Sequence, residues 1–279
     1  MGDATGIEPL SYFPCRHAGS VQSFRGPGRE MSGRFVAAIG GAETFGPFVP
    51  RPFPALLEER VGLPVINLGL QQAGLPVIAG DPAVAHALDA AALCVVQPPP
   101  PHALSNPFYR VHPRRNDRFL AATDQLTRLF PEVDLVSVHF TGHLVRRLRD
   151  TDPQRFQIVA RALRRAWQAE VSTLLARARG ATVLLWIDRP DGPTPQILRP
   201  EDRVALSRQA SATVRLGIVA ENPPTRGMIF AAGDLVAARQ SLTPDAHARI
   251  AKALAPAMTE LLGETGDEKT GPATGTDPA

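Results

Sequence analysis

Short apolar runs recur along the chain, each bounded by glycine, proline or a polar turn. Such runs are typical of strands that are buried on both faces of a sheet. Four of them are Arg34–Ile39, Pro64–Leu68, Ala92–Gln97 and Thr182–Ile187. Val214–Val219 and Met228–Ala231 predict two further short strands, and Leu135–Phe140 is strand-like but ambiguous.

Segments with apolar residues at helical spacing lie between these runs. Three helices are expected to open on a polar residue followed by proline, at Asp81-Pro82, Asp152-Pro153 and Thr243-Pro244. The polar residue can accept hydrogen bonds from free amides, and proline loses nothing at the first helical position. The predicted helices are Pro52–Gly62, Asp81–Ala91, Asn116–Phe130, Pro200–Thr213 and two longer ones that begin at Asp152 and Thr243.

The order strand, helix, strand, helix predicts an α/β domain with a mainly parallel sheet and helices on both faces. Residues 1–32 are rich in glycine, proline and arginine, which predicts an irregular arm. The α/β domain follows over residues 33–262. Residues 263–279 are rich in Gly, Thr, Asp and Pro and predict a disordered tail.

Charge and cysteine content exclude several classes of protein. The net charge is only +3, which does not predict nucleic-acid binding. Nearly all positive charge is arginine, because the lysines are Lys252 and Lys269. The apolar runs are too short to cross a bilayer, and residues 1–10 lack a basic start followed by an apolar stretch. Cys15 and Cys94 form no disulfide framework, so we expect a cytoplasmic protein without a membrane partner.

Parallel sheets bind ligands at the carboxyl ends of their strands. The third predicted strand stops at the prolines Pro98–Pro101, which open a long excursion that reaches Arg118. Long loops at strand ends are commonly functional. The residues that follow the first two strands are also expected to line a site, and they are Gly41, Glu43, Thr44, Gly69 and Gln71.

The excursion contains the densest basic cluster of the chain. Its members are Arg110, His112, Arg114, Arg115 and Arg118. Arginine forks bind phosphate or carboxylate in a bidentate manner, so one interpretation is a small anionic ligand such as a nucleotide, a coenzyme A-like molecule or an acidic sugar. The other interpretation is that these arginines pair with Asp117, Glu132 or Asp134 and brace the excursion.

The sequence offers little for a metal or a cofactor. His139 and His143 are four residues apart, as metal ligands on a helix are, but a third ligand is not visible nearby. The chain has neither a Gly-Lys-Ser/Thr phosphate loop nor a Gly-x-Gly-x-x-Gly motif. We therefore predict neither a metal nor a cofactor.

Four short motifs occur in the order of the SGNH (GDSL-type) hydrolase superfamily. They are AIGGAETFG at Ala38–Gly46, INLG at Ile66–Gly69, Asn106 after the third strand, and LTPDAHARIA at Leu242–Ala251. The chain resembles that superfamily, which implies a flavodoxin-like three-layer sandwich. The resemblance also implies an activity, that of an esterase or acyltransferase acting on an acylated carbohydrate.

The residues that carry this superfamily's chemistry differ here. The nucleophilic serine falls at Ala42, the histidine at Ser241 and the aspartate at Ala238. A serine hydrolase needs its nucleophile, base and orienting residue in contact. The fold can therefore be shared while the chemistry is absent.

Three residues remain as catalytic candidates. Thr44 is a candidate for a displaced nucleophile, His247 for a displaced base, and Asn106 stands where the superfamily has its asparagine. Alternatively, Thr44 bonds backbone amides at a turn, and His247 has a structural role beside Asp245 in the first turn of the last helix.

Longer matches connect the chain to an uncharacterised family of domains, found mainly in alphaproteobacteria, which it resembles. They are FRGPGRE at Phe24–Glu30, GGAETFGPFVPRPFPALLEE at Gly40–Glu59, SNPFYRVHPRRNDRFL at Ser105–Leu120 and HFTGHL at His139–Leu144. This resemblance implies a shared structure and brings no known activity with it.

Together these observations favour a degenerate SGNH-like domain that binds a small anionic ligand without turning it over. His112, Arg114, Arg115 and Arg118 are its expected ligand-binding residues in the excursion. An esterase or acyltransferase is the first alternative. A structural or assembly protein, with Pro98–Pro101 as a partner surface, is the second. The sequence predicts no oligomeric state.

Overall fold

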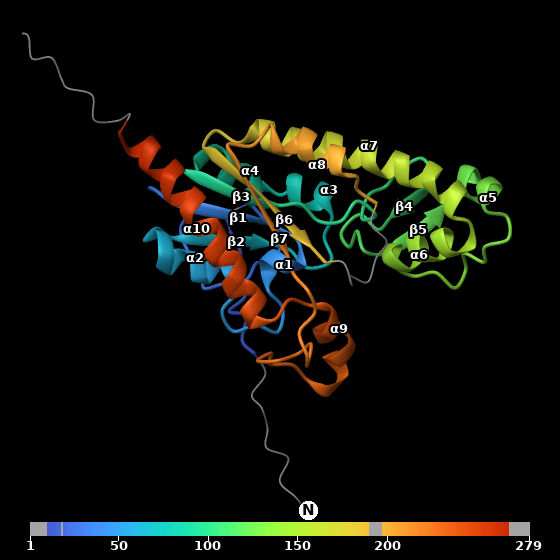
Figure 1. Ribbon diagram of the computed structural model, residues 1–279, viewed down its shortest axis with the longest axis horizontal. Helices are drawn as coiled ribbons and strands as arrows, with labels where there is room; N and C mark the ends of the chain where they lie inside the picture. The colour runs from blue at the N-terminus through green and yellow to red at the C-terminus, as the bar shows by residue number, and fades with distance from the viewer. Residues whose placement is uncertain (1–9, 18, 190–196, 268–279) are drawn as a thin grey trace, which may run out of the picture.

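Five parallel strands form the central sheet (Figure 1). The computed structural model describes residues 10–17, 19–189 and 197–267. The strands are β1 (Val36–Gly40), β2 (Val65–Gly69), β3 (Leu93–Gln97), β6 (Ala181–Asp188) and β7 (Ala212–Gly217). Their order is β2-β1-β3-β6-β7, which counted along the sheet's own strands is the 2-1-3-4-5 order of flavodoxin-like folds. The predicted parallel α/β class is confirmed, and the switch point lies between β1 and β3.

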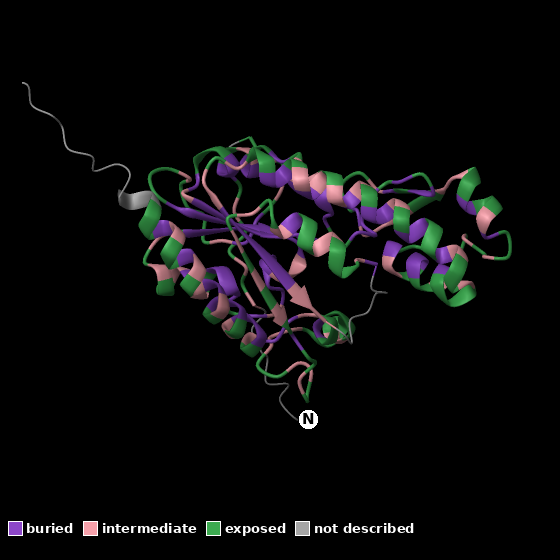
Figure 2. Cartoon of the chain, turned by 45° about the horizontal axis from the view of Figure 1, so that its top comes forward, coloured by how far each residue is buried: buried purple, intermediate pink, exposed green. Residues whose placement is uncertain are grey.

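Helices cover both faces of this sheet and complete three layers (Figure 2). One layer consists of α2 (Phe53–Val61) and α10 (Pro244–Asp267), which pack on the side chains of Val36 and Ala38. The alternate residues of β1, Ala37 and Ile39, face the other layer. That layer consists of α3 (Leu75–Ala79), α4 (Pro82–Ala90), α7 (Pro153–Arg177) and α8 (Pro200–Ser207).

The excursion after β3 opens a separate lobe with its own hydrophobic core. Its elements are β4 (Tyr109–Val111), β5 (Phe119–Ala122), α5 (Asp124–Leu129) and α6 (Thr141–Thr151). Helix α7 joins the lobe to the sheet, because Phe156 and Leu163 pack in the lobe core whereas Trp167 and Leu174 pack against the sheet (Figure 1). The apolar side chains of α7 are thus divided between two cores.

The structure corrects the prediction of one helix over Asn116–Phe130. Phe119–Ala122 is a strand that pairs with β4, and only Asp124–Leu129 is helical. The pairing partner lies earlier in the excursion, so the local pattern could not reveal it. Leu135–Phe140 is not a strand. It forms an isolated bridge between Phe140 and Arg118, and the carbonyl of His139 accepts from the amide of Phe119 at the start of β5. His139 precedes α6, so it does not share a helix with His143.

Other boundaries also differ from the predictions. Met228–Ala231 is not a strand, and the amide of Ile229 donates to the carbonyl of Phe48 in the loop after α1. Helix α8 ends at Ser207 and β7 begins at Ala212, which shortens the predicted helix. Helix α10 continues to Asp267, past the predicted start of the tail, and residues 268–279 lie outside the described part. Unpredicted elements are α1 (Ala42–Phe45), η1 (Ala232–Asp234) and α9 (Leu235–Gln240), together with α3 and α6.

The described part of the arm, residues 10–17 and 19–32, is irregular apart from a bridge between Cys15 and Phe24. Its Arg25 is 6% exposed and reaches into the loop after α1. The guanidinium donates to four backbone carbonyls, those of Phe45, Gly46, Val49 and Pro50. Within the described ranges, no helix is both long and apolar enough to cross a membrane.

Candidate functional site

Glycines at the ends of β1 and β2 allow α1 to lie directly on the sheet edge. A Cβ on Gly69 would lie 2.2 Å from the backbone nitrogen of Phe45, and one on Gly40 would lie 2.2 Å from Oγ1 of Thr44. Real Cβ atoms do not approach other atoms so closely. These glycines are therefore required by packing, and no phosphate needs to be invoked for them.

The side chain of Gln97 makes hydrogen bonds across the switch point between β1 and β3. Its Oε1 accepts hydrogen bonds from the amide of Gly41 at 3.1 Å and from Oγ1 of Thr44 at 3.2 Å. Its Nε2 donates to the carbonyl of Pro98 at 3.0 Å. Gln97 is 6% exposed, so the donors at this point are satisfied internally by a buried amide. The sequence pattern did not single out Gln97.

Thr44 and His247 are both fully buried but do not share a hydrogen bond. Thr44 Oγ1 has Gln97 as its partner among the described residues. His247 Nδ1 accepts from the amide of Phe53 at 3.1 Å, and its Nε2 lies beside Gly46. Burial, and then the charge of Arg25, lower the pKa of His247 to about 3. This histidine is therefore neutral near pH 7, and it makes no contact that could activate the threonine.

The remaining predicted strand-end residues fall into two groups. A Cβ on Gly41 would lie 3.7 Å from Oε2 of Glu43, so this carboxylate folds back over the strand end. Gln71 is exposed in the turn after β2. Asn106 instead belongs to the lobe, where its Oδ1 accepts from the amides of Phe108 at 2.9 Å and Tyr109 at 3.3 Å, an Asx-type turn.

The predicted basic cluster lies on the surface of the excursion. His112 Nδ1 accepts from the amides of Arg114 and Arg115, both at 3.2 Å, and both arginines are exposed. Arg118 lies over the ring of Phe140, 4.1 Å from its centroid. Glu132, one of the carboxylates that could have braced the cluster, pairs with Arg155 instead.

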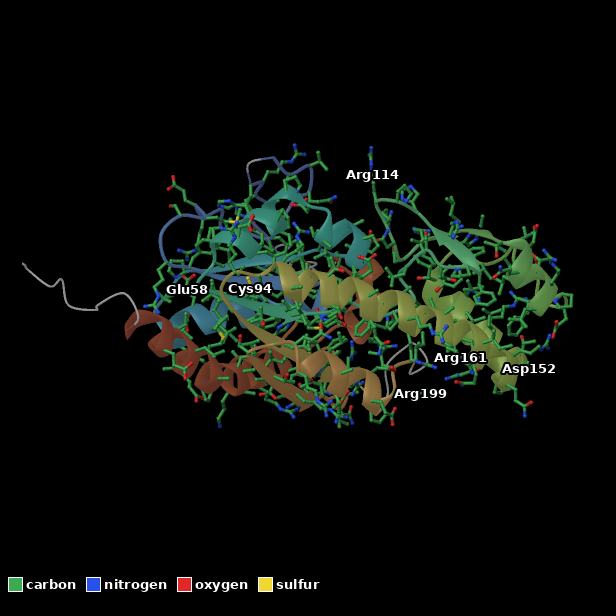
Figure 3. All side chains as sticks on the ribbon, turned by 90° about the horizontal axis from the view of Figure 1, so that it is seen from above. Glu58, Cys94, Arg114, Asp152, Arg161 and Arg199 are labelled. Atoms are coloured by element: carbon green, nitrogen blue, oxygen red, sulfur yellow. The ribbon has the colours of Figure 1, made fainter. Side chains whose placement is uncertain are left out.

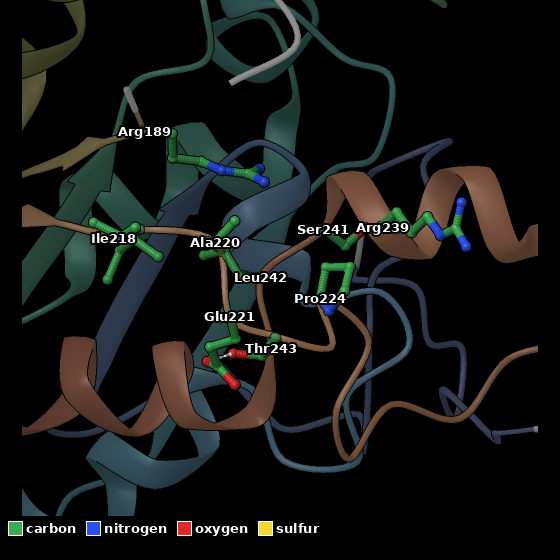
Figure 4. Close-up of a pocket in the computed structure, with 10 residues that line it drawn as sticks. Arg189, Ile218, Ala220, Glu221, Pro224, Arg239, Ser241, Leu242 and Thr243 are labelled. Atoms are coloured by element: carbon green, nitrogen blue, oxygen red, sulfur yellow. Dashed lines mark hydrogen bonds between the residues drawn. The ribbon is translucent and has the colours of Figure 1, made fainter. Parts of the chain in front are cut away.

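A small cavity lies beside Ser241, where the superfamily resemblance places a histidine (Figure 4). Arg189, Glu221 and Thr243 contribute to its lining, and Thr243 donates a hydrogen bond to Glu221. The cavity has a volume of about 30 Å³, room for about two water molecules. It does not accommodate an acyl ester.

A much larger hollow lies between α7 and the start of α8. Its volume is about 580 Å³. It is lined by Arg161, Arg164, Arg165, Gln168, Arg199, Pro200, Glu201 and Asp202, and we call it the α7–α8 pocket. In Figure 3, Arg199 lies on one side of α7 and Arg114 on the other, so this pocket is separate from the excursion cluster.

Asp202 braces the pocket by joining its two walls. It accepts from the amide of Arg199 at 2.7 Å and from Nε2 of Gln168 at 2.8 Å. It also lies 3.6 Å from Nε of Arg164, whose side chain is 8% exposed. Burial first, and then the nearby charges of Arg199 and Arg161, lower the pKa of Arg164. Arg199 and Arg161 are therefore close enough for their charges to act on Arg164 at this hollow.

The α7–α8 pocket lies beyond the carboxyl edge of the sheet. Trp167 of α7 donates to the carbonyl of Pro99 at 2.7 Å, and Pro99 comes just after β3. The pocket arginines precede Trp167 on α7, and α8 begins after the carboxyl end of β6. Open α/β sheets bind ligands outside this edge. The available sequence signal was three arginines, Arg161, Arg164 and Arg165, at one-turn spacing on a predicted helix.

Among the described residues, no group of three or more histidine, cysteine, aspartate or glutamate side chains could hold a metal ion.

Comparison with known proteins identifies the family of the chain. The family described as "Domain of unknown function (DUF6473)" matches residues 1–262, so the chain belongs to this family. No curated protein matches the chain.

Two solved structures are similar to this one. The first is a carbohydrate esterase family 2 enzyme with a carbohydrate binding domain from Corynascus thermopiles (Myceliophthora fergusii), with 13% identity, a TM-score of 0.40, and coverage of 85% of this chain and 69% of that one. The second is a carbohydrate esterase described as having divergent catalytic and non-catalytic binding functions, with 10% identity, a TM-score of 0.38, and coverage of 88% and 71%.

Proposed function

We propose that this member of the DUF6473 family is a non-hydrolytic, degenerate SGNH-like domain that binds a small anionic ligand in the α7–α8 pocket. The observation that carries the proposal is the lining of that pocket. Four arginines and two carboxylates line an open hollow of about 580 Å³. Guanidinium forks suit phosphate and carboxylate groups better than lysine does.

An esterase or acyltransferase has less support. Thr44 donates to an amide oxygen and His247 accepts from a backbone amide, so neither activates the other. Acyl transfer by a hydroxyl requires a base within hydrogen-bond reach. The cavity beside Ser241 is also too small for a substrate. Cys15 and Cys94 are free thiols, which fits the cytoplasmic location expected from the sequence.

The test is a ligand screen followed by a matched pair of variants. We expect at least one of inorganic phosphate, AMP, coenzyme A, glucose 6-phosphate and glucuronate to raise the melting temperature at millimolar concentration. Calorimetric affinity for that ligand should fall at least about tenfold in Arg161→Ala/Arg165→Ala, a loss of about 1.4 kcal/mol.

The control is Arg114→Ala/Arg115→Ala, which removes the same charge from the excursion cluster. Its affinity should stay within about twofold of the native value, because Arg114 lies on the other side of α7 from Arg199 and Arg115 is its neighbour in the chain. The proposal fails if none of the five anions raises the melting temperature. The proposal also fails if Arg114→Ala/Arg115→Ala loses affinity for the ligand while Arg161→Ala/Arg165→Ala retains the native affinity.

A further inference from the structure

The charge balance of the α7–α8 pocket identifies the class of anion that fits it. Asp202 offsets the charge of Arg164. Arg164 also donates to the carbonyl of Ile197 at 3.3 Å, and Asp202 accepts from Gln168 and from the amide of Arg199. Three guanidinium groups then remain, those of Arg161, Arg165 and Arg199, and all three residues are exposed. None of them forms an ion pair with another described residue.

Glu201 is the remaining carboxylate on the lining. Three guanidinium groups against one carboxylate leave an excess of two positive charges. A carboxylate or a sulfate ester neutralises one of these charges, whereas a phosphate monoester above pH 6 neutralises nearly two. Its three equivalent oxygens can also accept from forks on both walls. The balance therefore favours a dianion.

The size and polarity of the pocket describe the rest of the ligand. A hollow of about 580 Å³ is far larger than one phosphate group, so there is room for an attached body. Of the described lining residues, Pro200 is the one apolar member, and no aromatic ring is present to stack on a base. Glu201 and Oε1 of Gln168 are acceptors suited to hydroxyl groups.

We propose that the α7–α8 pocket binds the phosphate monoester of a hydroxylated body, the chemistry of a sugar phosphate. This inference rests on the proposed function and deepens it. Arg161 and Arg165 of α7 and Arg199, at the N-cap of α8, hold the phosphate from opposite walls. Glu201 and Gln168 meet the hydroxyl groups.

The experiment compares esters that differ in charge while their body stays the same. Glucose 6-phosphate should bind at least about tenfold more tightly than glucose 6-sulfate at pH 7.5 in calorimetry, because only the phosphate is a dianion there. At pH 5 this advantage should shrink to about twofold. Glucose 6-sulfate is a monoanion at both values, so it is the reference against which the change in phosphate charge is measured.

Two further ligands and one variant complete the test. Inorganic phosphate and AMP should both bind at least about threefold more weakly than glucose 6-phosphate. Inorganic phosphate lacks the hydroxylated body, and the base of AMP meets no aromatic ring among the described lining residues. Arg199→Ala should reduce the preference of phosphate over sulfate at pH 7.5. A control, Arg128→Ala on α5 in the lobe, should leave the preference unchanged.

The outcomes separate the two proposals. Equal affinities for glucose 6-phosphate, glucose 6-sulfate and glucuronate would overturn the phosphate inference and leave anion binding in place. Tighter binding of AMP or inorganic phosphate would overturn the hydroxylated body. If no anion binds at all, the proposed function fails as well.

Discussion

Two regions lie at the carboxyl edge of one sheet. One is the packed switch point around Gly41, Thr44 and Gln97, which we call the crevice, and the other is the α7–α8 pocket. They differ in how their polar groups are used. In the crevice, Gln97 satisfies the donors of Gly41 and Thr44, and glycines let α1 pack onto the strand ends. In the pocket, exposed arginines surround an open hollow. A crevice whose donors are already bonded contributes to stability, whereas unpaired charge around a hollow is available for a ligand.

The largest expected effect comes from filling the contact at Gly69. Gly69→Ala places a Cβ 2.2 Å from the backbone nitrogen of Phe45, which cannot move without shifting α1. We expect a loss of about 4 kcal/mol in the free energy of unfolding, at the high end for overpacking. Gly217→Ala is the matched control, because its Cβ would meet no atom within 4 Å. Equal denaturation midpoints for the two variants would contradict the close packing of the crevice.

Removing the side-chain acceptor of Gln97 should have the next largest effect on the free energy of unfolding. Gln97→Leu preserves the size of the side chain but leaves the amide of Gly41 and the hydroxyl of Thr44 without a partner. Stability should fall by about 3 kcal/mol, the cost of two unsatisfied buried donors. The affinity of the pocket for its anion, measured by calorimetry on the folded variant, should not change. A tenfold change in that affinity would show that the two regions act as one site.

The buried His247 should make stability depend on pH. Its pKa is about 3 in the folded protein and near 6.5 when unfolded, so below pH 6.5 the unfolded chain binds a proton that the folded chain does not. Stability is therefore fully present above pH 6.5 and is lost as the pH falls towards 3. Between pH 7.5 and pH 5 the native protein should lose about 2 kcal/mol more than His247→Asn.

The exposed His143 provides the control for this measurement. His143→Asn should retain the acid-dependent loss of the native protein. If His247→Asn shows the same pH dependence as the native protein in urea titrations, His247 is not held neutral by burial.

Removing a single pocket arginine should lower the affinity for the anion and leave stability nearly unchanged, whereas the crevice substitutions lower stability. Arg199→Ala keeps the backbone amide that donates to Asp202, so the start of α8 is preserved. Affinity for the bound anion should fall about tenfold, or about 1.4 kcal/mol, while the free energy of unfolding changes by less than about 0.5 kcal/mol. Loss of stability without loss of affinity would remove the distinction between the two regions.

The smallest expected effect tests the displaced nucleophile. Thr44→Val removes one hydroxyl and leaves Gln97 with the amide of Gly41. Stability should fall by about 1 kcal/mol, as is typical for one buried hydrogen bond. Release of p-nitrophenol from short-chain esters should equal the buffer rate with and without the substitution. A native rate well above buffer that disappears in Thr44→Val would revive the esterase alternative.

The sheet was predictable because its signals are local. Buried strands are continuous apolar runs, and the helix starts at Asp81 and Asp152 carry their own capping residues, whose carboxylates accept from amides as expected. The lobe was not predictable in the same way. Phe119–Ala122 is a strand because it pairs with β4, which lies earlier in the excursion. The local pattern of apolar residues does not contain information about such a partner.

The candidate site was predictable only in part, for a similar reason. The strand-end rule correctly located Gly41, Thr44 and Gly69 at the carboxyl edge, but their roles in ligand binding or catalysis stay predictions. The α7–α8 pocket was missed because Arg199 lies far along the chain from Arg165. They come together through Asp202, which bonds Gln168 on the other wall, and that contact exists only after the helices pack.

Arg25 has a consequence for where this domain begins. Its buried guanidinium satisfies four carbonyls of the loop that carries α1, so a segment with no regular structure supplies part of the interior. A chain shortened to start at Arg34 would expose those carbonyls and loosen α1. Proteolysis between Arg25 and Arg34 would then destabilise the domain, because the piece removed carries the guanidinium that these carbonyls bind.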